Sequence, residues 1–477
     1  FFFGIDVKCR CYLSNIMQET PKRSKEQWDK DAVYVGVLVA ISYSLCDFWR
    51  TTIFVLPPEV LQQKVGVIFG RDIDLQVAFS LAFSFGFGLA KMPGVIVMTG
   101  QYFHSHRLTV LGSVMVVSML IHGLGIFCFA RAPLHQVTCV FFSTFFQSWI
   151  FGGLFSYLEG RKCTETLVAI VMCLYTFAGP ASRSAARFVL EVGVPVSKMP
   201  LVLGATTCPV AVVLLYLADR SRGVRPSAAD IQERAQRKPV GPRVQWQFMC
   251  DNALGLFCLI LSLTLMSSLR SLREFYGQDI FTAALHRQTP PSSIFFFLVD
   301  VPGSLMACGV MLSFNRFSDN GVALRAMMGV AYLCACVLLG ASEMSQAEMI
   351  GGQAWCILAG VCIYSGYGIM CGPWYDRLVA ATKFEGTCTF LIFISDAAAF
   401  TGTIALLLYQ IFFVPETQDG VGPGTSLTSF MAFLYFCCMA MVVLLVAGIA
   451  YYTKKLGVGG GFALGSKLEA KPLTGLP

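Results

Sequence analysis

Apolar segments of about 20 residues or more recur along almost the whole chain, and they constrain its fold more than any other feature. A bilayer core about 30 Å thick needs roughly 20 apolar residues for each helix that crosses it. A membrane β-barrel would instead show segments of about 10 residues with alternating polarity. With 56% hydrophobic and 13% charged residues, the chain carries more apolar surface than a soluble fold buries. The sequence therefore predicts an all-α integral membrane protein.

Twelve membrane spans can be delimited, and a strongly basic stretch separates the first six from the last six. The spans cover residues 32–56, 73–99, 107–130, 133–158, 164–192, 196–219, 244–270, 289–314, 322–341, 348–373, 386–412 and 426–453. The predicted domains are a basic N-terminal segment at 1–31, six-helix bundles at 32–219 and 244–453, a basic linker at 220–243 and a flexible tail at 454–477.

The basic linker runs from Arg220 to Arg243, and two interpretations of it remain open. Ser227 stands three residues before Asp230, between two prolines, which is typical of a short capped helix. A solvated linker without regular structure fits the same residues equally well. The chain begins at Phe1 rather than at a methionine, which leaves open a leader segment upstream.

Positive charge predicts the orientation of the spans. Most of the 35 Lys and Arg residues fall in the two terminal segments and the even-numbered loops. Loops rich in Lys and Arg stay on the cytosolic side of a membrane. We therefore expect both termini and the linker in the cytosol, or in the equivalent compartment of an organelle, since the host membrane is not determined.

The two halves of the chain also resemble each other. FGRDI at 69–73 is similar to YGQDI at 276–280, and LAKMPG at 89–94 is similar to LVDVPG at 298–303, at nearly the same separation. This pattern favours parallel repeats related by an axis along the membrane normal.

Twelve spans, a basic central loop and two repeated halves resemble the major facilitator superfamily over residues 32–453. The box SYLEGR at 156–161 further resembles a little-characterised branch of that superfamily, known mainly as a family of unknown function. The loop after the second span departs from the superfamily pattern at His104, where an Asp is usual. Arg183 and Ser184 likewise replace the glycines expected after Gly179 and Pro180. These departures argue against drug and sugar porters.

Charged residues inside the spans are the candidates for a substrate or gating site, because an ionised group at the bilayer centre costs about 2.5 kcal/mol or more. They are Asp47 and Arg50 in the first span, Lys91 in the second, Arg183 and Arg187 in the fifth, Asp300 in the eighth and Asp396 in the eleventh. Asp47 and Arg50 share a helical face, so they form either a local ion pair or a substrate contact.

The superfamily resemblance implies that the second span faces the eleventh and the fifth faces the eighth. Lys91 would then meet Asp396 near the midplane, and Arg183 or Arg187 would meet Asp300. Protonation of either carboxylate would release its partner and couple a proton to the rocking of the halves. The alternative is a set of static pairs that fix helix register.

A second group of charged residues lies at the expected cytosolic ends of the spans, where it could latch the loops. Its members are Arg107, Glu159, Arg161, Arg316, Asp376 and Arg377. A simple supply of interfacial positive charge explains the cations equally well.

These observations predict a secondary active transporter that works by alternating access, coupled to protons, for a small anionic or zwitterionic organic solute. Four cations against three carboxylates in the spans favour negative charge on the solute. The alternative is a transporter-like subunit that assembles with other membrane proteins and transports nothing. The sequence carries neither a phosphate-binding G-x-x-x-x-G-K-[ST] motif nor a catalytic or metal-binding cluster. We therefore expect no enzyme activity, cofactor, metal or nucleic-acid partner, and a lipid bilayer around the chain.

Overall fold

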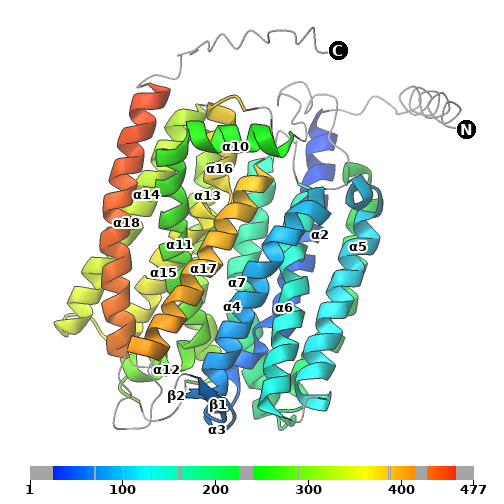
Figure 1. Ribbon diagram of the computed structural model, residues 1–477, viewed down its shortest axis with the longest axis vertical. Helices are drawn as coiled ribbons and strands as arrows, with labels where there is room; N and C mark the ends of the chain where they lie inside the picture. The colour runs from blue at the N-terminus through cyan, green and yellow to red at the C-terminus, as the bar shows by residue number, and fades with distance from the viewer. Residues whose placement is uncertain are drawn as a thin grey trace, which may run out of the picture.

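The computed structural model describes residues 25–68, 71–99, 101–129, 132–158, 164–224, 240–287, 289, 291–317, 319–384, 386, 388–413 and 427–457. Within these residues, twelve helices are long and apolar enough to cross a membrane. They stand side by side in one bundle (Figure 1). The structure thus confirms the predicted multi-pass, all-α membrane fold.

The first half of the chain supplies six of the spanning helices and a small hairpin. The spanning helices are α2 (Lys25–Arg50), α4 (Leu75–Thr99), α5 (Gln101–Leu120) with its π-helical extension η2 (Ile121–Phe129), α6 (Pro133–Phe155), α7 (Thr164–Glu191) and α8 (Met199–Arg220). The connecting elements are η1 (Thr52–Val55), α3 (Pro58–Leu61), the antiparallel strands β1 (Lys64–Ile68) and β2 (Arg71–Asp74), and η3 (Arg222–Val224).

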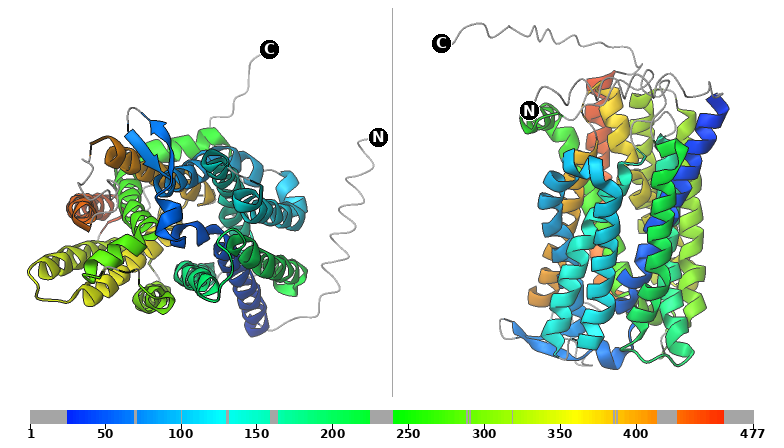
Figure 2. Two further views of the ribbon diagram at one scale, coloured as in Figure 1. Left: turned by 90° about the horizontal axis from the view of Figure 1, so that it is seen from below. Right: turned by 90° about the vertical axis from the view of Figure 1, so that its right-hand side faces the viewer.

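The second half supplies the other six spans. They are α11 (Ala253–Phe275), α13 (Ser293–Ser313), α14 (Asn320–Gln346), α15 (Gly352–Met370) continued by α16 (Pro373–Ala381), α17 (Thr389–Phe413) and α18 (Leu427–Leu456). Shorter elements are α10 (Pro242–Asp251), α12 (Gly277–Ala284) and η4 (Phe314–Arg316). Seen along the bundle, the helices of the first half gather on one side and those of the second half on the other (Figure 2).

The bundle has two distinct ends. We call the end where α2 begins, α18 ends and α10 lies across the helices the terminal face, and the opposite end, with β1, β2 and α12, the hairpin face (Figure 1). At the terminal face the Lys455 ammonium donates to Asn252 Oδ1 at 2.8 Å. At the hairpin face Lys64 pairs with Asp74 at 2.8 Å. The cytosolic location of the terminal face stays a prediction from the positive charge.

Glycines bring the helices of each half close together. The Cβ of any larger residue at position 86 in α4 would lie 2.6 Å from the Phe141 carbonyl oxygen of α6. In the second half, Gly303 of α13 packs directly on Gly360 of α15, where an added Cβ would lie 2.8 Å from backbone atoms. Such approaches are common between membrane helices, because van der Waals packing replaces the hydrophobic drive there.

The two halves meet along two helix pairs, α4 with α17 and α7 with α13, which we call the seam. Phe87 of α4 stacks on Phe400 of α17 with ring centroids 5.0 Å apart and planes at 16°. The thiols of Cys173 in α7 and Cys308 in α13 are hydrogen-bonded across the other pair. These are the pairings of second with eleventh and fifth with eighth spans that the superfamily resemblance implies.

The seventh span lies further along the chain than the sequence predicts. The seventh span was expected at 244–270, but residues 242–251 form the separate helix α10 and the span is α11, Ala253–Phe275. The chain turns at Asn252, whose side chain donates to the Phe248 carbonyl at 2.9 Å. The shift brings Arg273 and Glu274 into the span. The proposed capped helix at Ser227, most of the linker and both terminal segments lie outside the described residues.

Candidate functional site

A narrow cavity lies between the two halves. The space inside it is about 40 Å³, which is room for a few water molecules. Five charged side chains from both halves line it: Arg50, Lys91, Arg270, Glu274 and Asp396. Buried charges gathered around a cavity at the interface of two repeats are typical of transporter binding sites.

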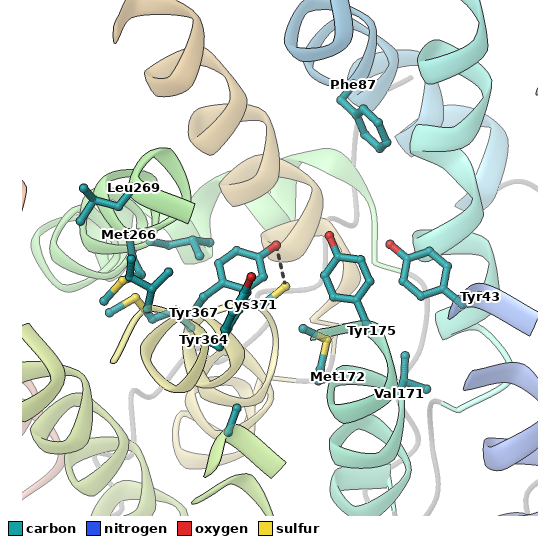
Figure 3. Close-up of a cluster of buried hydrophobic side chains, with 14 of the residues drawn as sticks. Tyr43, Phe87, Val171, Met172, Tyr175, Met266, Leu269, Tyr364, Tyr367 and Cys371 are labelled. Atoms are coloured by element: carbon teal, nitrogen blue, oxygen red, sulfur yellow. Dashed lines mark hydrogen bonds between the residues drawn. The ribbon is translucent and has the colours of Figure 1, made fainter. Parts of the chain in front are cut away.

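Aromatic rings form most of the remaining wall. They belong to Tyr43, Phe83, Phe87, Phe151, Tyr175, Tyr367 and Phe400. The hydroxyl ends of Tyr43, Tyr175 and Tyr367 lie in a row, with Phe87 above them (Figure 3). Tyr43 stacks on Tyr175 with centroids 5.2 Å apart. The cavity therefore offers flat apolar faces together with hydroxyl groups.

Arg50, near the end of α2, is a buried cation of the cavity wall. It is 5% exposed and forms an ion pair with Asp47 one turn earlier. Its guanidinium lies 5.6 Å from the Phe87 ring centroid and 5.5 Å from that of Tyr175. Among the described residues, Arg50 Nε has no hydrogen-bond partner. A buried guanidinium with a spare N–H is suited to receive an anionic group.

Arg270 and Glu274 occupy the corresponding place near the end of α11, and the sequence reasoning missed both. They pair at 3.0 Å, one helical turn apart. The Arg270 guanidinium lies 4.6 Å from the Tyr367 ring centroid and 5.7 Å from that of Tyr175. The misplaced boundary put Glu274 outside the seventh span. A pair of opposite charges about one turn apart at the end of the first span of each half was the available signal.

Lys91 and Asp396 meet across the α4–α17 contact at 2.9 Å. The Lys91 ammonium also lies 5.3 Å from the Phe393 ring centroid and 3.4 Å from the Ser148 carbonyl oxygen. The side chain of Asp396 is 13% exposed, and it lines the cavity. The pair thus joins the two halves at the edge of the cavity.

Asp300 of α13 lies between two guanidinium groups. Arg183 of α7 contacts it across the seam at 2.8 Å, and Arg273 of α11 contacts it within its own half at 2.6 Å. The carboxylate is 0% exposed. Arg273 was missed for the same reason as Glu274. Arg187, the other candidate partner of Asp300, has no hydrogen bond at Nε to the described residues.

The two cross-seam pairs lie at different depths, although the sequence placed both near the midplane. Lys91 is eight residues from the end of α4 at Thr99 on the terminal face, which is about 12 Å along the axis. Arg183 is eight residues from the end of α7 at Glu191 on the hairpin face, again about 12 Å. Each pair is therefore nearer to a different face of the membrane.

The predicted latch residues separate into three groups. Glu159 and Arg161 lie outside the described residues. Arg107 pairs with Asp219 at 3.1 Å and lies 4.0 Å from the Tyr157 ring centroid, all within the first half.

In the second half, Arg377 donates to the carbonyl oxygens of Phe314 and Phe317 and to Asn320 Oδ1 at 2.7 Å. It therefore holds the loop that carries the exposed Arg316. Asp376 is buried next to it. A latching role for these residues stays a prediction.

At the hairpin face a polar contact also crosses between the halves. The Gln76 amide, at the start of α4, donates to Asp279 Oδ2 at 3.1 Å and to the Phe275 carbonyl at 3.2 Å. Burial raises the pKa of the Asp279 carboxyl, and the hydrogen bond from Gln76 offsets part of that rise. The contact therefore joins the two halves at the hairpin face through a titratable group.

The bundle has the same fold as solved membrane transporters, one of which is described as a member of the major facilitator superfamily. The chain superposes on the nucleoside transporter NupG with a TM-score of 0.56 at 13% identity, covering 88% of this chain and 99% of that one. The proton:xylose symporter XylE gives a TM-score of 0.60 at 11% identity, covering 91% and 96%. A bacterial homolog of the human lysosomal transporter Spinster gives 0.54 at 13%, covering 90% and 97%.

Residues 66–455 match the family described as "Family of unknown function (DUF5690)". The chain belongs to this family. A search among curated proteins found no match. Because their sequence identity to this chain is only 11–13%, the solved structures establish the fold alone.

Proposed function

We propose that this protein is a secondary active transporter that moves a small organic anion together with a proton by alternating access. The observation that carries the proposal is the cavity at the seam, where Arg50 and Lys91 of one half face Arg270, Glu274 and Asp396 of the other. A cavity lined by charges from both halves is exposed to either side when the halves rock.

The two cross-seam ion pairs act as gates in this mechanism. Separation of Lys91 from Asp396 opens the cavity toward the terminal face, and separation of Arg183 from Asp300 opens it toward the hairpin face. With both pairs formed, the space of about 40 Å³ is too small for an organic solute. Entry therefore requires one pair to break while the other holds.

Proton coupling resides at Asp396 rather than at Asp300. Asp396 has one cationic partner and lines the cavity, whereas Asp300 is enclosed by two guanidiniums and is fully buried. Proton binding at Asp396 removes its charge, which frees Lys91 to contact an anion. The description of XylE as a proton symporter makes such coupling a reasonable first test.

The test is uptake into proteoliposomes under an imposed pH gradient, with a panel of organic acids and amino acids. We expect flux in the native protein and its loss in Asp396→Asn. Glu59→Gln, which removes an exposed carboxylate at the hairpin face, is the matched control and should keep native flux. Equal flux in Asp396→Asn and the native protein would remove Asp396 from the mechanism.

The alternative, a subunit that transports nothing, makes a different prediction for the same experiment. It predicts no flux with any solute and stable co-purification with other membrane proteins. Uptake by the purified chain alone would exclude it.

A further inference from the structure

We propose, building on the transport function above, that the cavity takes a monovalent carboxylate attached to a flat aromatic ring. The carboxylate binds at Arg50, and the ring inserts between Phe87 and Phe400. The argument has three parts, which concern the charge of the cavity, its aromatic walls and the distance between them.

The charges around the empty cavity are balanced. Arg50 pairs with Asp47, Arg270 with Glu274, and Lys91 with Asp396. One proton on Asp396 leaves a single positive charge, which one carboxylate neutralises. A dicarboxylate would leave one buried negative charge without compensation, which is unfavourable. The cavity therefore suits a monoanion that enters with one proton.

The aromatic walls contain a slot that opens when the halves separate. Phe87 belongs to the first half and Phe400 to the second, and their planes are nearly parallel at 16°. This ring-to-ring contact bridges the seam. Separation of the halves leaves two parallel aromatic faces, between which a third ring restores the lost contacts. An aliphatic ring of similar size lacks the planar face and the quadrupole that favour stacking.

Arg50 stands at the correct distance to hold the acidic group of such a molecule. Its guanidinium lies 5.6 Å from the Phe87 ring centroid, and its Nε has no partner among the described residues. A carboxylate attached directly to a ring stacked on Phe87 would reach this N–H. The Tyr175 ring, whose centroid lies 5.5 Å from the same guanidinium, adds a second aromatic contact to Arg50.

The first test is ligand binding to the purified full-length protein in detergent, measured as the shift in its melting temperature. The second is uptake of the same ligands by proteoliposomes. Benzoate is the probe, with cyclohexanecarboxylate as the non-aromatic acid, benzamide as the neutral ring and phthalate as the dianion. We expect benzoate to bind about fivefold more tightly than cyclohexanecarboxylate, the size of an aromatic pair interaction. Benzamide and phthalate should bind far more weakly than benzoate.

Phe400→Leu should reduce the preference for benzoate over cyclohexanecarboxylate to about one, because it removes one face of the slot. Phe142→Leu, which alters an exposed ring on the outer face of α6, is the matched control and should keep the full preference. Phe87→Leu provides a second variant if Phe400→Leu does not fold.

The outcomes separate this inference from the proposed function. Equal binding of benzoate and cyclohexanecarboxylate, or of benzoate and benzamide, overturns the substrate class even if another anion is transported. Selective benzoate binding without any flux keeps the site and overturns transport.

Discussion

At the scale of single residues, the seam contains buried charges whose partners come from different elements. Lys91 and Asp396 were paired before the structure was known, because the superfamily resemblance placed their spans opposite each other. Arg273 was not found, since the seventh span was placed too early in the chain. Nor was the contact between Arg107 and Asp219 expected, because nothing in the spacing of two helix ends indicates which side chains meet. The positions of charged residues within the apolar spans predicted which of them are buried. Which partner each one contacts depends on how the helix ends pack.

Asp300→Asn should be strongly destabilising. The change leaves Arg183 and Arg273 buried without a counter-ion, and breaking a buried ion pair from one side costs about 3–5 kcal/mol. Asp396→Asn should cost less, because Asp396 is partly exposed to the cavity. Thermal unfolding of both variants in detergent measures the difference. Equal melting temperatures of the two variants would mean that water or lipid compensates the positive charges of Arg183 and Arg273 when Asp300 is lost.

Asp279 should make the hairpin face sensitive to pH. Burial raises the pKa of this carboxyl in the folded protein, so its contribution to stability is present below its ordinary pKa near 4. That contribution is lost as the pH rises through the raised pKa. Between pH 4 and pH 7, the melting temperature should therefore fall more steeply with rising pH for the native protein than for Asp279→Asn.

Tyr276 lies near this carboxyl and near Asp74, and both Tyr276 and Asp74 are unchanged in the variant. Identical pH profiles for the two proteins would show that the carboxyl is ionised equally in the folded and unfolded chains.

At the scale of helices, α7 and α13 carry a native reporter of the seam. The hydrogen-bonded thiols of Cys173 and Cys308 belong to opposite halves, and both are free. Oxidation by copper phenanthroline should join them, each sulfur losing one proton and one electron to the oxidant. The disulfide should stop transport, and a reducing agent should restore it, because the halves can no longer separate there.

Peptide mass spectrometry identifies the cross-link, and Cys173→Ser serves as the control in which oxidation leaves flux intact. Full activity of the cross-linked protein would show that α7 and α13 stay together throughout the transport cycle.

At the scale of the whole molecule, the positive charge predicts which face meets the cytosol. Cys250, exposed on α10 at the terminal face, should react with a membrane-impermeant maleimide only from the cytosolic side. Gly66, beside which an added side chain meets nothing within 4 Å, gives the opposite probe. Gly66→Cys in a Cys250→Ser background should react only from outside. Labelling of both positions from the same side would contradict the orientation.

The division of charge between the halves has a consequence for how this protein could be assembled. The first half brings the cations Lys91 and Arg183 to the seam, and the second brings the carboxylates Asp300 and Asp396. A dimer of two first halves would bury four cations without a carboxylate opposite, and a dimer of two second halves would bury four carboxylates without a cation opposite. The halves are therefore complementary and not interchangeable. Produced as two separate polypeptides, they should recognise each other and reject copies of themselves.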